Sequence, residues 1–394
     1  MAFTALDYAA DTRVRARARS RRRSAESVQS LARRLDWTLL LAVAGLVVYG
    51  LWAIGGLNEH DQRQGVYAAI GAVGLVACLF VDPDFYRRHR RPLYVLLLAI
   101  LLLVIATAPV IRGSQRWLDI GSFRFQPSEF GKLMLVLALA GFIADRGKRI
   151  AEGRTVLAAV GLAAVPLLLV FEQPDIGSSL VYGAALAGVL FIAGTRWLHL
   201  GALLAAAVAI GTFVLWLGPA MGVELLEDYQ RERLTAFTNP SEDPGGAAYN
   251  VNQSILAVGA GGLDGRGVTG ATQTNLDYLP EDATDFAFAS LAEQRGFFGG
   301  AILLALYLLV IWRALKIITV ARDPFSAIVA GGIAVALFVQ IAINVGMTVG
   351  MAPVTGIPLP FVSLGGSSMI TNLVAIGILE AIHSRGRLPR RAAP

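Results

Sequence analysis

Charged residues are scarce in this sequence. Asp, Glu, Lys and Arg together make up 16% of its 394 residues, whereas a soluble domain carries about a quarter. Hydrophobic residues make up 55%, and the mean hydropathy is +0.60. A soluble core does not hide so much apolar surface beneath so few charges, and a disordered chain does not contain it. The composition therefore excludes disorder and a plain cytosolic enzyme, and it predicts a polytopic membrane protein.

Cysteine and histidine are also rare. The single cysteine, Cys78, cannot form an intramolecular disulfide, which excludes a secreted disulfide scaffold. The four histidines lie far apart, at His60, His89, His199 and His383. Neither a Ser-His-Asp triad nor a Cys/His metal cluster is indicated. A carboxylate is therefore the best-supported candidate for a catalytic base.

Ten mostly apolar runs have the length that a bilayer-spanning helix needs, which is about 20 residues. They predict an all-α membrane fold with ten transmembrane helices. Trp37, Trp197, Trp216 and Trp312 lie near proposed interfaces, where tryptophan is enriched. The predicted spans are residues 37–57, 65–81, 93–111, 127–144, 156–171, 176–193, 200–218, 296–312, 325–349 and 366–383.

The basic residues divide unequally between the connections. With the N-terminus inside, the inner segments hold 25 Lys and Arg residues and the outer segments hold 8; Lys132 lies within a span, which accounts for all 34. Positive residues favour the cytoplasmic side, so both termini are predicted to be cytoplasmic. Residues 1–36 then form a basic, disordered tail, 37–383 the membrane domain and 384–394 a second basic tail. The first tail does not resemble a cleavable signal peptide; it contacts anionic lipid or, alternatively, a regulatory partner.

One predicted connection is unusually long. Residues 219–295, between the seventh and eighth spans, form a 77-residue loop on the outer face with twelve acidic and four basic residues, a net charge of −8. Such a loop repels an anionic substrate on average, so the substrate must meet local cations. Long loops are usually functional or disordered, and this one is not of low complexity.

Polar residues at membrane depth are costly and are functional candidates. The first group combines Arg116 and Trp117, in the sequence GSQRW at 113–117, with Glu129 and Lys132, in QPSEFGK at 126–132. Glu129 and Lys132 are three residues apart and share a helix face. They are either a structural ion pair or the floor of an outward-facing pocket in which Arg116 and Lys132 meet phosphate.

Three further groups follow on the predicted outer side. Asp175 caps the next helix or lines a site. If a helix begins at LPEDATDF, 279–286, Glu281 and Asp285 share one face of it. Repulsion between paired carboxylates can then raise the pKa of one of them and make it a usable base. The alternative is that these acidic residues only stabilise the N-terminus of the helix. Asp285 stands out because apolar residues follow it at once. Residues 350–368, which include Ser367, contain prolines that exclude a continuous helix. This segment is predicted to form either the wall of a cavity or a surface loop.

Together these groups resemble the SEDS family (shape, elongation, division and sporulation) of bacterial cell-wall polymerases. The resemblance covers about 36–383 and rests on motifs that occur in one order: GSQRW at 113–117, QPSE at 126–129 with Lys132, QPD at 173–175, Tyr249 with Gln253 and Ser254, LPE at 279–281, TDF at 284–286, and residues 344–368. The segments GATQ at 270–273 and PVTGIPLP at 353–360 are more similar to the RodA elongation branch than to the FtsW division branch.

The resemblance implies a glycosyltransferase that polymerises lipid II into β-1,4-linked glycan strands and releases undecaprenyl pyrophosphate. By motif position the essential aspartate is Asp285, which we expect to act as general base on the acceptor 4-hydroxyl. The expected substrate-binding residues are Arg116, Trp117, Glu129, Lys132, Asp175, Glu281, Arg233 and Ser367, with Arg266 as a further candidate cation. Ala283 replaces the family histidine before TDF, so a histidine relay to Asp285 is absent.

The resemblance also implies conditions and partners. A divalent cation, Mg²⁺ or Mn²⁺, is expected, with no organic cofactor and no nucleic acid. The expected partners are a class B penicillin-binding protein, the elongation machinery and the membrane, and the expected location is the bacterial cytoplasmic membrane with the active site facing outside. The alternatives are a flippase for the lipid-linked precursor, an FtsW-type division polymerase and a scaffold for other wall enzymes.

Overall fold

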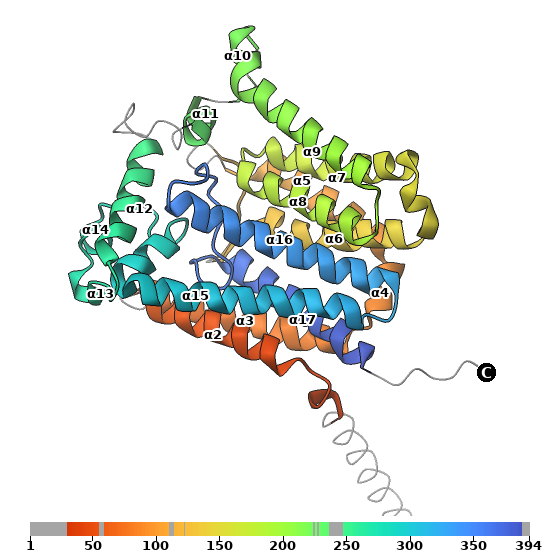
Figure 1. Ribbon diagram of the computed structural model, residues 1–394, viewed down its shortest axis with the longest axis horizontal. Coiled ribbons are helices and arrows are strands. Elements are labelled where there is room, and N and C mark those ends of the chain that lie inside the picture. The colour runs from red at the N-terminus through yellow and green to blue at the C-terminus, as the bar shows by residue number, and fades with distance from the viewer. Residues whose placement is uncertain are drawn as a thin grey trace, which may run out of the picture.

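The computed structural model describes residues 30–54, 59–109, 114–121, 123–223, 225–226, 228–235 and 247–387. Most of the two predicted tails, residues 1–29 and 388–394, therefore lies outside the described residues. Long helices dominate the rest, and Figure 1 shows them gathered side by side in one bundle. The only strands among the described residues, β1 (Leu118–Ile120) and β2 (Phe123–Phe125), form one antiparallel hairpin.

Helices occupy all ten predicted positions. The first half contains α2 (Trp37–Ile54), α3 (Glu59–Phe80), α4 (Pro83–Arg88), α5 (Arg90–Thr107), α6 (Pro127–Ala144), the 3₁₀ turn η1 (Gly147–Ala151), α7 (Gly153–Phe171) and α8 (Ile176–Ile192). The second half contains α9 (Trp197–Thr212), the π-helical η2 (Phe213–Leu217), α10 (Gly218–Ala220), α11 (Asp228–Thr235), α12 (Ala247–Gly261), α13 (Gly267–Gly270), α14 (Thr272–Asn275), α15 (Ala287–Val320), α16 (Pro324–Thr348) and α17 (Gly366–Gly386).

Eight helices in the described part of the chain are long and apolar enough to cross a bilayer. Two shorter apolar helices, Trp37–Trp52 and Ile176–Ile192, fill the remaining predicted positions. The all-α polytopic membrane fold predicted from the sequence is confirmed, while the count of ten crossings stays a prediction.

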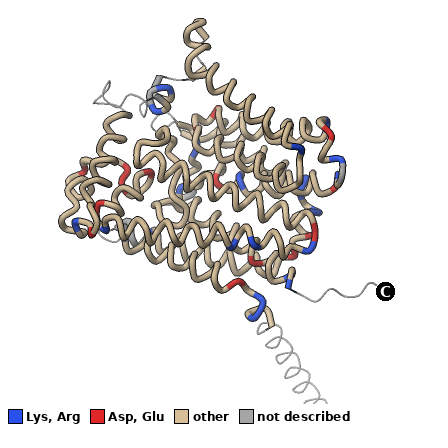
Figure 2. The backbone as a smooth tube through the Cα atoms, viewed as in Figure 1, with Lys and Arg blue, Asp and Glu red and all other residues tan. Residues whose placement is uncertain are grey.

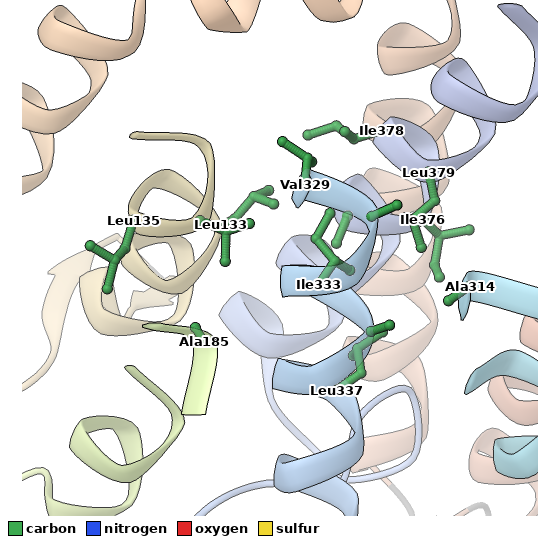
Figure 3. Packing of buried hydrophobic residues seen from close by; sticks show 14 of the residues in the cluster. Leu133, Leu135, Ala185, Ala314, Val329, Ile333, Leu337, Ile376, Ile378 and Leu379 are labelled. Carbon is green, nitrogen blue, oxygen red and sulfur yellow. The ribbon is translucent and has the colours of Figure 1, made fainter. Parts of the chain in front are cut away.

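The centre of the bundle is formed by α6, α16 and α17. In the most apolar 18 residues of each, 78%, 67% and 83% are buried, whereas no residue of α9, which lies on the outside, is buried. Figure 3 shows Leu133 of α6 facing Ile333 of α16, with Ile376 and Leu379 of α17 beyond them. Side chains from three helices thus interlock around the segment that carries Glu129 and Lys132.

Many charged residues lie toward the two ends of the bundle, and several lie between them, as Figure 2 shows. At the end near the C-terminus, Asp36 accepts a 2.8 Å hydrogen bond from Arg313 Nε, and its backbone N–H donates to Glu380 over 2.9 Å. This buried cluster ties the start of α2 to α15 and α17. The helices α11 to α14 of the predicted 219–295 loop gather at the opposite end (Figure 1).

The predicted span that starts at residue 296 coincides with a break in α15: Gly296 has non-helical backbone angles, and a short helical piece, residues 287–295, precedes it. Gly296 has a φ of +65°, and a Cβ there would lie 2.3 Å from the backbone nitrogen of Gly265. Only glycine allows this approach without strain. The glycine-rich run of the loop, residues 259–267, therefore packs directly on α15, whose first residue follows Asp285 by two positions.

Candidate active site

Three of the predicted site residues meet at Gly356, in the non-helical segment between α16 and α17. A Cβ built on Gly356 would lie 3.4 Å from Asp285 Oδ2, 3.8 Å from Arg116 Nη1 and 3.9 Å from Arg233 Nη1. These residues come from three distant parts of the chain, and all three are partly exposed. One carboxylate and two guanidinium groups thus surround a point that the missing side chain of Gly356 leaves open.

Asp175 fixes the position of Arg116. Its carboxylate lies 3.6 Å from Arg116 Nη1, and Asp175 is 2% exposed. It also accepts bonds from Gln126 Nε2 at 3.0 Å, Ser128 Oγ at 2.9 Å and the Ser178 backbone N–H at 3.1 Å. The last bond confirms the predicted capping of α8. Asp175 thus caps α8 and contacts Arg116, while its predicted part in substrate binding stays a prediction.

The guanidinium of Arg116 also stacks on its neighbour Trp117. The central carbon of Arg116 lies 4.3 Å from the centre of the Trp117 ring. One face of the indole is therefore covered by protein, which limits a sugar to the other face. Arg116 Nε is buried and has no hydrogen-bond partner, so the group carries unused donor capacity.

Ser367 supports this region through the hairpin that precedes α6. Its hydroxyl accepts a 2.8 Å bond from the Gln126 backbone N–H and donates to Arg124 O at 3.3 Å. Since Gln126 in turn binds Asp175, Ser367 connects the start of α17 to the side chain that holds Arg116. The observed contacts of Ser367 are thus with the protein, and its predicted contact with substrate stays a prediction.

Glu129 and Lys132 form the ion pair predicted from their spacing. Lys132 Nζ donates to Glu129 Oε1 at 2.8 Å and to Gln340 Oε1 of α16 at 3.0 Å. Lys132 and Gln340 line a small cavity of about 30 Å³ between α6, α16 and α17. Gln340 was missed by sequence reasoning, although a lone amide in an apolar span is a recognisable signal.

The expectation that Glu281 and Asp285 share a helix face is wrong. Residues 280–286 form turns, and helix α15 begins only at Ala287. Glu281 has a φ of +57°, which no helix accommodates. Its carboxylate accepts a 2.8 Å bond from the Thr284 hydroxyl, one residue before Asp285. Glu281 therefore shapes the turn that presents Asp285.

Arg266 does not belong to the cluster of charged groups around Gly356. Its guanidinium donates to Ala260 O at 3.0 Å and to Thr272 Oγ1 at 3.2 Å, within the loop. Of the two loop arginines considered as cations, Arg233 is the one near Asp285.

The segment between α16 and α17 is non-helical, as its prolines predict, and much of it is buried. Asn344 Nδ2 donates to Ile357 O at 2.7 Å, and Gln340 Nε2 donates to Pro358 O at 2.9 Å. Tyr307 donates to Pro360 O at 2.5 Å. Side chains thus satisfy carbonyls that a helix would have paired internally, which is how irregular backbone survives at membrane depth.

A divalent cation finds no ready-made cage. Within the described ranges, no three His, Cys, Asp or Glu side chains gather in a geometry that could hold a metal ion. Two arginines also lie beside Asp285 and oppose a nearby cation. The residues do not fit a metal site made of protein ligands alone, so no step of the chemistry is derived through one.

Replacing Gly356 with alanine is expected to slow the reaction at this site by about tenfold or more. The added methyl fits by van der Waals distance but fills the space between three charged groups, and a displacement of about 1 Å can cost about 10²-fold. The turnover rate is the quantity to measure. Gly121→Ala is the matched control, since Gly121 has a similar φ of +63° and no atom within 4 Å of its Cβ position. Equal rates for the two variants would show that Gly356 borders no reacting group.

Comparison with known proteins finds relatives that match most of the chain. The model of the FtsW, RodA and SpoVE family, described as cell cycle proteins, matches residues 33–388. The peptidoglycan glycosyltransferase MrdB of Escherichia coli K12 is 38% identical over 358 residues, which is 90% of this chain and 95% of MrdB. Stage V sporulation protein E of Bacillus subtilis is 36% identical over 87% of this chain and 93% of its own length.

Solved structures show the same fold. A chain of a peptidoglycan synthase complex, studied for its coordination of polymerization and crosslinking, superposes with a TM-score of 0.78 at 29% identity over 90% of this chain and 98% of that one. The rod shape determining protein RodA of Thermus thermophilus gives a TM-score of 0.68 at 27% identity, over 90% and 98% of the two chains. The family predicted from the ordered motifs is confirmed: this chain belongs to the FtsW, RodA and SpoVE family.

Proposed function

We propose that this chain is a peptidoglycan glycosyltransferase that polymerises lipid II at the outer face of the bacterial cytoplasmic membrane. The observation that carries the proposal is the meeting of Asp285, Arg116 and Arg233 around Gly356. A sugar transfer from a diphosphate donor needs a base for the acceptor and positive charge for the leaving group. This cluster contains both, in a family with members named as peptidoglycan glycosyltransferases.

In the proposed reaction, Asp285 accepts the proton of the acceptor 4-hydroxyl. The acceptor oxygen then forms a β-1,4 bond to the anomeric carbon of the donor, and the bond from that carbon to the diphosphate breaks. Undecaprenyl pyrophosphate leaves with the electron pair. Arg116 and Arg233 stabilise its charge by charge-assisted hydrogen bonds, which offsets the repulsion from the acidic 219–295 loop.

The remaining predicted residues act around this centre. Asp175 and Ser367 hold the Arg116 side of the site, and Glu281 shapes the turn before Asp285. Trp117 offers its uncovered face to a sugar ring. Glu129 and Lys132 lie by the pocket next to α16 and α17, where Lys132 is a second cation for phosphate.

A divalent cation and a partner protein complete the proposal. Mg²⁺ is commonly held by one or two carboxylates together with substrate phosphates, so we expect a divalent cation to enter with the diphosphate. A class B penicillin-binding protein is the proposed partner, since a similar chain belongs to a peptidoglycan synthase complex.

A role in elongation is favoured by the similarity to MrdB and RodA, and an FtsW-type role in division is the alternative.

The main rival function is a flippase for lipid II. Purified protein in liposomes with labelled lipid II and Mg²⁺ or Mn²⁺ separates the two by measuring polymer and translocation in one sample. The polymerase account predicts glycan strands that depend on Asp285. Translocation without polymer, at equal rates with and without Asp285, would favour the flippase.

The outward orientation of the site has its own test. In a Cys78→Ala background, Asp264→Cys is expected to react with a membrane-impermeant maleimide on intact cells, because Asp264 is exposed in the loop next to the site. Arg154→Cys is the control; this exposed residue lies in a predicted cytoplasmic connection and should react only after permeabilisation. The reverse pattern of labelling would invert the topology.

A further inference from the structure

Asn344 of α16 joins two segments that border the candidate active site. The side chain is fully buried, and its Nδ2 donates to Asp285 O at 2.8 Å and to Ile357 O at 2.7 Å. Ile357 directly follows Gly356, the residue around which Asp285, Arg116 and Arg233 meet. One amide group therefore bridges the backbone of the proposed base and the wall that the base faces.

We propose that Asn344 is a positioning residue that sets the place of Asp285 relative to the Gly356 wall and its two arginines. The inference rests on the proposed function, because it assigns Asn344 a part in the same reaction. Asn344 touches the backbone of Asp285, so it acts through that residue.

Two other hydrogen bonds between the two segments lie upstream of Asp285. Ser363 Oγ donates to Thr284 O at 2.5 Å, and the Leu364 backbone N–H donates to Ala283 O at 2.8 Å. These bonds attach the turn at residues 280–286 to the segment before α17. Asn344 adds a bond at the backbone of Asp285 itself, so its loss removes the support nearest to Asp285 while the turn stays attached.

Burial of the Asn344 side chain also costs free energy, and packing alone does not explain why this cost is tolerated. Its Oδ1 is buried without a hydrogen-bond partner, and such a group costs about 1–3 kcal/mol. The two hydrogen bonds that Nδ2 donates to Asp285 O and Ile357 O offset this cost. Gln340, one helical turn earlier on the same face, holds Pro358 O in the same manner, so α16 anchors the wall at two successive points.

The test compares Asn344→Ala with Gln64→Ala in a polymerisation assay on purified protein with lipid II. Gln64 is a matched control: it is fully buried, donates to Ser363 O at 2.9 Å and accepts from Gly365 N at 3.3 Å. It therefore binds the same wall without contacting Asp285. For Asn344→Ala we expect kcat to fall about 10–10²-fold, the effect of a misplaced catalytic group, with KM changed less than about threefold. Gln64→Ala should lower the unfolding temperature but keep kcat.

Asn344→Ser is measured beside them, since its shorter hydroxyl keeps one donor and is the milder change if the alanine variant fails to fold. A fall in kcat with KM preserved in either Asn344 variant supports the inference. If kcat falls no further than in Gln64→Ala, or if only KM changes, the inference is overturned while active wild-type protein leaves the proposed function standing. Folded wild-type protein that makes no glycan would overturn the proposed function and this inference with it.

Discussion

Asp285→Asn is expected to lower the rate of glycan polymerisation by about 10²–10⁴-fold, the contribution of a positioned general base. Asparagine has nearly the same shape as aspartate, but its amide does not take up the acceptor proton. The Asp285 oxygen Oδ2 lies 3.4 Å from a Cβ built on Gly356, and one guanidinium nitrogen of Arg116 and one of Arg233 lie within 4 Å of the same point, so a proton acceptor stands close to cations for a leaving diphosphate. Single-turnover assays with labelled lipid II measure the chemical step directly.

Asp264→Asn is the control for this experiment. Asp264 is an exposed acid in the same loop, and surface substitutions of this kind change energies by about 0.5 kcal/mol or less. The control should therefore polymerise within about twofold of wild type. Wild-type rates from folded Asp285→Asn protein would remove Asp285 from the mechanism.

Lys132→Met should have the largest effect on stability, lowering the free energy of unfolding by about 3–5 kcal/mol. The pair of Lys132 and Glu129 is buried, with side-chain exposures of 7% and 2%. Removal of the lysine leaves the glutamate without its charge partner and Gln340 Oε1 without its donor. Thermal unfolding of the purified protein in detergent provides the measurement.

A double variant separates structure from function at this pair. Glu129→Gln together with Lys132→Met should recover most of the lost stability, because no uncompensated charge stays buried. If Lys132 meets substrate phosphate as proposed, the double variant stays slow although it is folded. Arg124→Met is the control, since Arg124 and Asp119 are 67% and 49% exposed and such pairs contribute little. Equal unfolding temperatures for Lys132→Met and Arg124→Met would contradict the buried-pair account.

The sequence predicted the membrane helices well because hydrophobic runs and their breaks are local. The span predicted at 127–144 coincides with α6, where Pro127 opens the first turn. The short helical piece before Gly296, residues 287–295, was not predicted, because the sharp break at Gly296 depends on the distant backbone of Gly265. A glycine in an apolar run marks either a helix boundary or a bend, and only the tertiary contact decides between them.

The sequence predicted the individual residues of the site but not the contacts between them. Asp285, Arg116 and Arg233 were singled out by charge and by motif, yet their meeting at Gly356 depends on the fold of the 350–365 segment. The helix-face pairing of Glu281 with Asp285 failed because the positive φ of Glu281 makes a turn. Gln340 received no role from the sequence because a lone amide within a hydrophobic span does not indicate its partner.

Incubation of the purified protein with labelled lipid II, followed by product separation and muramidase digestion, tests the proposed function most directly. The proposed function predicts glycan strands that the muramidase cuts into short fragments, and it predicts their loss in Asp285→Asn protein of unchanged unfolding temperature. Unchanged lipid II after incubation with folded wild-type protein, divalent cation and partner protein would contradict it.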